Sequence, residues 1–163
     1  MRGAVLLLAL AVASPAAAQA IDRAYAAPDA KLAATVRAPA GAETLYVSGC
    51  IAAVVDPAAA EGSPARFGGF TEAQTTRVLD KIEGLLKAQG YGLADVVDLR
   101  VYLAPDPANG GRLDFAAMGR AYDRRFGTAA QPNRPARNTV GVAALPIPGT
   151  LVQIEATAAR LRK

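Results

Sequence analysis

The sequence has no histidine and a single cysteine, Cys50, among its 163 residues. Without histidine the chain cannot form a Ser-His-Asp triad, a Cys-His dyad or an HExxH zinc site. One thiol also cannot build a cysteine-rich zinc or iron–sulfur centre, which needs several thiolates. Any chemistry must therefore depend on carboxylates, arginines, hydroxyls, backbone groups or water.

A dense run of positive charge is also missing. The formal net charge is only +4, and the longest basic runs are the pairs Arg124-Arg125 and Arg162-Lys163. A nucleic-acid-binding surface would need a denser basic stripe with aromatic residues between the charges. We therefore expect no nucleic-acid partner.

The N-terminus has the pattern of an export signal. Arg2 precedes an apolar run over residues 4–13, and small residues follow at 16–20. This pattern predicts a signal peptide over residues 1–20, with cleavage after Ala18 or Ala20. The apolar run is shorter than the roughly 20 residues that a membrane span requires. We expect a periplasmic or secreted protein with no membrane attachment after cleavage, in which Cys50 has no intrachain disulfide partner.

The remaining sequence predicts an N-terminal arm or one weak edge strand over 21–41, and a single domain over 42–163. Thr71 and Gln74 form a capping-box pattern at the start of a first helix, which Gly90 ends. The predicted elements are strands at 45–52, 97–103, 137–145 and 151–158, and helices at 71–90 and about 112–126, the second with an apolar stripe of Phe115, Met118, Tyr122 and Phe126. This order predicts an α+β fold, a sheet with both helices packed on one face.

Alternation along the strands assigns side chains to the two faces of this sheet. The apolar residues expected to share a face are Leu45, Val47 and Ile51 in the first strand, Val97, Leu99, Val101 and Leu103 in the second, Val140, Val142 and Ala144 in the third, and Val152, Ile154, Ala156 and Ala158 in the fourth. If the helices cover that face, Arg137 and Glu155 both point to the other one.

Two interpretations of Arg137 and Glu155 remain open at this point. They are either ordinary polar residues on a solvent-facing sheet, or charges at an interface where another subunit covers the sheet and where each charge must be paired or bind a ligand. The alternation alone does not decide between them.

Several motifs occur together in one order and spacing. They are Leu45-Tyr46-Val47-Ser48-Gly49, Gln74-Thr75, the stripe of the second helix, Pro135-Ala136-Arg137-Asn138-Thr139-Val140, Leu145-Pro146 and Leu151-Val152-Gln153-Ile154-Glu155-Ala156. Over residues 43–160 the chain resembles the RidA (YjgF-type) family of reactive-intermediate deaminases.

The resemblance implies a chorismate-mutase-like mixed sheet, a homotrimer, and ligand clefts between subunits. It also implies hydrolysis of 2-imino or 2-enamino acids to 2-keto acids and ammonia, without a metal or other cofactor. Arg137 would hold the substrate carboxylate and Glu155 would activate water, while Ser48, Gly49 and Thr139 would line the cleft. The alternative is a non-catalytic module of the same trimeric fold that binds a small carboxylate or a protein.

The chain departs from the family pattern at several positions. Cys50 stands where glutamine is usual, and we expect its thiol to be unreactive. Lys81 and Gly119 replace helix asparagines of the family. The family pattern also has a tyrosine near position 35, where this chain has Thr35, and Tyr25 lies further upstream. Extra residues also occur in the loops at 58–69 and 106–111.

Overall fold

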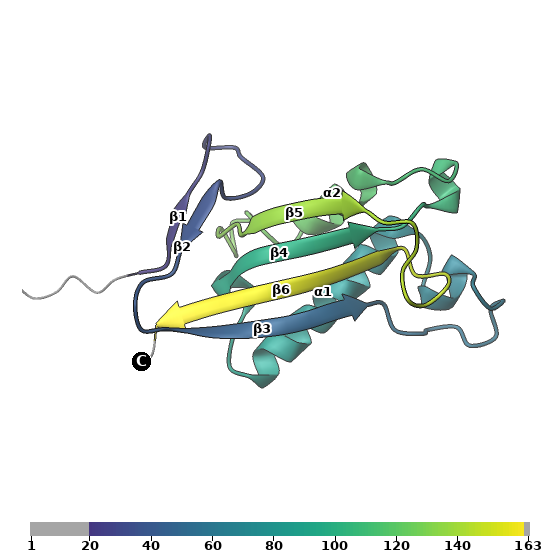
Figure 1. The fold of residues 1–163 in the computed structure, drawn as a ribbon, viewed down its shortest axis with the longest axis horizontal. Coiled ribbons are helices and arrows are strands. Elements are labelled where there is room, and N and C mark those ends of the chain that lie inside the picture. The colour runs from purple at the N-terminus through teal and green to yellow at the C-terminus, as the bar shows by residue number, and fades with distance from the viewer. Residues whose placement is uncertain (1–19, 162–163) are drawn as a thin grey trace, which may run out of the picture.

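The computed structural model describes residues 20–161, and the predicted signal peptide lies outside them apart from Ala20 (Figure 1). The strands are β1 (Asp22–Ala24), β2 (Thr35–Arg37), β3 (Ala42–Ile51), β4 (Val96–Leu103), β5 (Ala136–Gly141) and β6 (Val152–Leu161), and the helices are α1 (Thr71–Ala88) and α2 (Phe115–Asp123). Three short 3-10 turns, at Pro64–Phe67, Leu93–Asp95 and Pro107–Asn109, complete the connections.

The main sheet has four strands in the order β3-β6-β4-β5. β6 pairs antiparallel with β3 and β4, whereas β4 and β5 are parallel. Both helices lie behind the sheet in Figure 1, so among residues 20–161 no helix or strand covers the other face. The predicted mixed α+β sheet with two helices on one face is confirmed.

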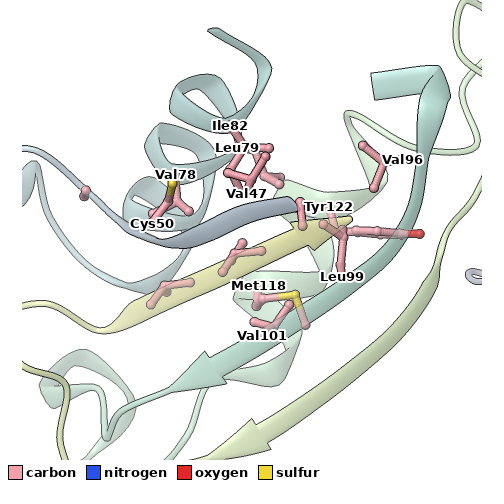
Figure 2. Close-up of a cluster of buried hydrophobic side chains, with 14 of the residues drawn as sticks. Val47, Cys50, Val78, Leu79, Ile82, Val96, Leu99, Val101, Met118 and Tyr122 are labelled. Carbon is pink, nitrogen blue, oxygen red and sulfur yellow. The ribbon is translucent and has the colours of Figure 1, made fainter. Parts of the chain in front are cut away.

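The hydrophobic core fills the space between the sheet and the helices. Figure 2 shows Val78, Leu79 and Ile82 of α1 beside strand residues such as Val47 and Cys50. In β6 the inward residues are Val152, Ile154, Ala156 and Ala158, all at most 4% exposed. The alternation predicted for this strand is confirmed.

Irregular pairing changes the inward face of two other strands. In β3 the register shifts between Val47 and Cys50, so Cys50 rather than Ile51 follows Val47 into the core. In β4 a shift between Val96 and Asp98 buries Val96 in place of Val97. Each bulge inserts a residue that strict alternation does not foresee, because the bulge depends on the neighbouring strand.

The first helix begins differently from the prediction. Phe70 is the N-cap residue without a side-chain cap, and Thr71 is already helical, so the predicted capping box is wrong. Asp106 takes its place: its buried carboxylate accepts hydrogen bonds from the amide (3.0 Å) and hydroxyl (2.6 Å) of Thr71 and from the amide of Ala108 (2.8 Å). A carboxylate at this end is favoured by the unpaired amides and by the helix dipole.

Gln74 contributes to tertiary structure instead of to a cap. Its buried side chain donates to the carbonyls of Gly69 and Gly149, both at 2.9 Å, and accepts from the amide of Leu151 at 2.8 Å. The side chain therefore fixes the loop before α1 against the loop before β6.

The second helix is shorter than predicted, because Asp114 caps it through the amide of Ala117 at 2.8 Å and starts it at Phe115. Met118, Tyr122 and Phe126 are buried as expected, whereas Phe115 is 47% exposed and does not belong to the core.

The N-terminal arm forms a two-stranded antiparallel sheet of its own, β1-β2, instead of one edge strand. It lies beyond the end of the main sheet where β4 and β5 begin (Figure 1). Arg23 donates to the carbonyls of Ala94 and Val96 at 3.1 and 3.2 Å, and the amide of Ala33 donates to the carbonyl of Pro135 at 3.0 Å. These bonds fix the arm against the start of β4 and against the segment that leads into β5.

Replacing Asp106 by alanine should destabilise the fold, because it leaves the buried donors at the start of α1 without their acceptor. We expect Asp106→Ala to lower the free energy of unfolding by about 2 kcal/mol, measured as a lower urea midpoint at an unchanged m value. Asp56→Ala is the matched control, since Asp56 accepts two amide hydrogen bonds in an exposed turn. Equal shifts for the two variants would contradict the role of Asp106.

Candidate functional site

Glu155 lies in a hollow of about 310 Å³ on the face of the sheet that the helices leave open. The hollow is lined by Tyr46, Val47, Ser48, Gly49, Asp98, Arg100, Glu155, Ala156 and Thr157. The structure thus brings together three of the predicted site residues: Glu155, Ser48 and Gly49.

The bulge in β3 explains how Ser48 and Gly49 come to flank Glu155. Val47 pairs with Ala156 and Cys50 with Ile154, which leaves Ser48 and Gly49 opposite Glu155. Such bulges are common beside active sites, because they redirect side chains at one point of a strand. A side chain at position 49 would also overlap the amide of Gln153, so glycine leaves that space free.

An arginine that the sequence analysis overlooked stands on the other side of Glu155. Arg100 of β4 is its direct cross-strand neighbour, with Nη1 3.9 Å from a Glu155 carboxylate oxygen and Nε 3.4 Å from Asp98. Arg100 is well exposed, so this contact contributes little to stability. Arg100 alternates with the apolar residues Leu99 and Val101, so the sequence places it on the same face as Glu155. This alternation could have identified Arg100 as a site residue.

Arg137 does not share this face, and the predicted common orientation is wrong. Its guanidinium carbon lies 4.2 Å from the ring centroid of Tyr122 in α2, on the helix side of the sheet. In the parallel ladder, Arg137 and Thr139 are level with the buried residues Leu99 and Val101. Thr139 therefore also belongs to the helix side.

The error has a physical cause in the position of β5. The prediction assigned Val140 to the core because it is apolar, but β5 is an edge strand that pairs only with β4. Val140 is 38% exposed there. The strand ends at Gly141, before the predicted inward residues Val142 and Ala144. The side chain that β5 packs against α2 is Arg137, through its cation–π contact with Tyr122.

Three polar atoms around Arg137 are buried without a hydrogen-bond partner among residues 20–161. They are Nη1 of Arg137, the hydroxyl of Thr139 and the hydroxyl of Tyr122. Buried polar groups are usually paired, and those that are not mark a place where a ligand or another chain can supply the partner. Arg137 is also without a carboxylate at ion-pair distance in the described part of the chain.

Burial dominates the electrostatics here. Burial lowers the pKa of Arg137, and the neighbouring Tyr122 and Asp123 act in the opposite direction by raising it. Burial also raises the pKa of Tyr122 to about 12, against the effect of Arg137. The phenol is therefore neutral and the guanidinium positive at neutral pH, which suits the binding of an anion.

The positions that depart from the family pattern have different environments. Cys50 packs in the core beside α1 (Figure 2), and burial raises the pKa of its thiol, in agreement with the expectation of an unreactive side chain. Thr35 is exposed in β2. Tyr25, by contrast, accepts a hydrogen bond from the amide of Arg134 at 3.2 Å, a proximity across 109 residues that no local pattern reveals.

The family model described as Endoribonuclease L-PSP matches residues 24–160. The chain belongs to the RidA/YjgF family. It is 39% identical over 90 residues to a RutC family protein of Pyrococcus horikoshii, covering 55% of this chain and 63% of that relative, which is less than two thirds of the relative's length.

Two solved structures have the same fold as this RidA/YjgF chain. One is a protein of the conserved Rid family from Yersinia pestis, at 29% identity and a TM-score of 0.56, covering 78% of this chain and 86% of the other. The second is a YjgF family member from Mycobacterium tuberculosis, at 30% identity and a TM-score of 0.51, covering 77% and 84%.

Within residues 20–161 no three histidine, cysteine or acidic side chains lie close enough to hold a metal ion. In the same part of the chain no helix has both the length and the apolar character to cross a bilayer.

The raised pKa of Tyr122 predicts a pH dependence of stability. Its ordinary value is near 10, so the neutral, buried phenol contributes stability that is complete below about pH 10 and is lost as the pH rises toward 12. We expect Tyr122→Phe to reduce the fall of the urea midpoint between about pH 10 and pH 12. Tyr46→Phe, at a ring that is 78% exposed, should keep the wild-type decline, and an equally steep fall in Tyr122→Phe would contradict this account.

Proposed function

We propose that this chain hydrolyses 2-imino and 2-enamino acids to 2-keto acids and ammonia, at a site shared between two protomers of a homotrimer. The observation that carries the proposal is the separation of Arg137 and Glu155 by the sheet. Within one chain they cannot reach the same small substrate. Two copies can join them if the open face of one protomer meets the β5 edge of the next.

Arg137 supplies the half of the site that binds the substrate. A planar guanidinium can hold a carboxylate through two parallel hydrogen bonds, which a lysine cannot do. Its unpartnered Nη1 and the unpartnered hydroxyls of Thr139 and Tyr122 would receive an anionic group without breaking an existing bond. Burial beside the Tyr122 ring fixes the orientation of the guanidinium before substrate arrives.

Glu155 supplies the half that activates water. Its carboxylate takes a proton from water, and the oxygen forms a bond to the electrophilic carbon of the iminium. The proton then moves to the amine nitrogen of the tetrahedral intermediate, the C–N bond breaks with its electron pair leaving on ammonia, and the C=O bond forms as the Glu155 carboxylate takes up the remaining hydroxyl proton. The step consumes one water and no electrons, so no oxidant, metal or other cofactor is required.

The open face of the sheet supports assembly with other copies. Tyr46 and Val140, which are 78% and 38% exposed, lie on it among polar side chains. A sheet face with exposed aromatic and aliphatic residues is a typical surface for a subunit contact. The predicted signal peptide would place this assembly in the periplasm or outside the cell, with no membrane or nucleic-acid partner.

A second candidate is the non-catalytic binding module. The contact of Arg100 with Glu155 favours it, because the carboxylate then has a cationic partner in addition to water. In this case a small carboxylate would occupy the cleft without being converted.

The activity can be measured by generating 2-iminobutyrate with an amino-acid oxidase and following the appearance of 2-oxobutyrate. The wild type should accelerate it, and Glu155→Gln should lower kcat by about 10²–10⁴-fold because it removes the base. Arg137→Ala should mainly raise KM, while Glu61→Gln and Arg112→Ala, both in exposed loops, should change neither.

The same experiment separates the two candidates. Turnover that depends on Glu155 supports the hydrolase. A wild type that 2-oxobutyrate stabilises against heat, but that does not accelerate hydrolysis, would contradict catalysis and favour the binding module.

A further inference from the structure

A second arginine lies three residues before Arg137 and has no role in the site described so far. The guanidinium carbon of Arg134 lies 5.6 Å from the ring centroid of Tyr25. In the described part of the chain no carboxylate lies at ion-pair distance from Arg134, although Arg120, Arg124 and Arg125 each have one. Arg134 is only half-exposed, so this charge is unpaired in a partly covered place.

The position of Arg134 is fixed from two sides. Its backbone amide donates to the hydroxyl of Tyr25, and its side chain lies against Gly127 so closely that a Cβ there would overlap the guanidinium. Gly127 has a φ of +71°, which itself favours glycine. These contacts restrict the positions that the Arg134 guanidinium can adopt.

Arg134 and Arg137 both lie near the buried phenol of Tyr122, since Arg134 packs against Gly127, the neighbour of Phe126, whose ring stacks on that of Tyr122 at a centroid distance of 4.9 Å. Tyr122 is 2% exposed, its hydroxyl has no hydrogen-bond partner among residues 20–161, and the Arg137 guanidinium covers its ring. The positive charge of Arg134 also lowers the pKa of Tyr122, as does that of Arg137, so both cations lie within electrostatic range of the phenol. A ligand with one carboxylate would neutralise only one of the two.

We propose that Arg134 binds the second carboxylate of a dicarboxylic ligand, so that the preferred substrates are the 2-imino derivatives of acidic amino acids. The inference rests on the proposed function for its chemistry and on Arg137 as the partner of the carboxylate next to the imine. Tyr25 and Gly127 hold Arg134 in place, and the unpartnered hydroxyl of Tyr122, whose ring the Arg137 guanidinium covers, is available as a hydrogen-bond donor. Arg134 is thus a specificity-determining residue.

Binding of stable 2-keto acids tests this inference without requiring turnover. Calorimetry on the wild-type oligomer should give a dissociation constant for 2-oxoglutarate about tenfold or more below that for 2-oxobutyrate, the gain expected from one additional charge-assisted hydrogen bond. Arg134→Gln should abolish this preference and Arg134→Lys should retain part of it. Arg112→Gln, which removes an exposed arginine elsewhere, should retain it fully.

Two results would overturn the inference. One is a wild type with no preference for the dicarboxylate. The other is an Arg134→Gln variant that weakens both keto acids equally together with a lower Tm, which would show that Arg134 only anchors the arm. Failure of the proposed function looks different, because the dicarboxylate preference would persist while no imine hydrolysis is detected.

Discussion

Both helices cover the same face of the four-stranded sheet, and this constraint decides where every polar side chain of the strands can lie. Residues that alternate with Ile154 and Leu99 must point away from the helices, which places Glu155 and Arg100 in the hollow on the open face. Residues level with Leu99 must point toward them, which places Arg137 against Tyr122. A sheet covered on one side thus separates the two chemical groups into two half-sites.

Each half of the proposed site contains a local irregularity. The bulge at Ser48-Gly49 opens the sheet beside Glu155, and the edge position of β5 leaves Arg137 and Thr139 with unpartnered polar atoms. Neither feature strengthens the core, since a regular ladder and paired polar groups would be more stable. The core is stabilised elsewhere, by the apolar layer under α1 and by the hydrogen bonds of Asp106 and Gln74 that join distant loops.

The sequence predicted the parts of the fold that depend on local periodicity. It predicted the two helices on one face and the inward residues of β6, because these follow from repeats of 3.6 and 2 residues along one segment. It did not predict the inward positions of Cys50 and Val96, or the contact of Tyr25 with Arg134, because these depend on the pairing of segments far apart in the chain. The predicted orientation of Arg137 was wrong for the same reason. It was derived from the burial expected for the apolar Val140, and an apolar residue indicates burial reliably only if its strand lies inside the sheet. Of the candidate site residues, Glu155, Ser48 and Gly49 lie together in the hollow, beside Arg100, which the sequence did not single out.

Mixing two impaired variants, assayed at a substrate concentration well below the KM of Arg137→Ala, tests the shared site most directly. Arg137→Ala and Glu155→Gln chains would be unfolded, combined in equal amounts and refolded together, with each variant refolded alone as the control. If the site takes Arg137 from one protomer and Glu155 from the next, random assembly leaves about one interface in four intact, and about a quarter of the wild-type imine hydrolysis should return. Mixed oligomers with no activity above that of the separate variants would contradict the account.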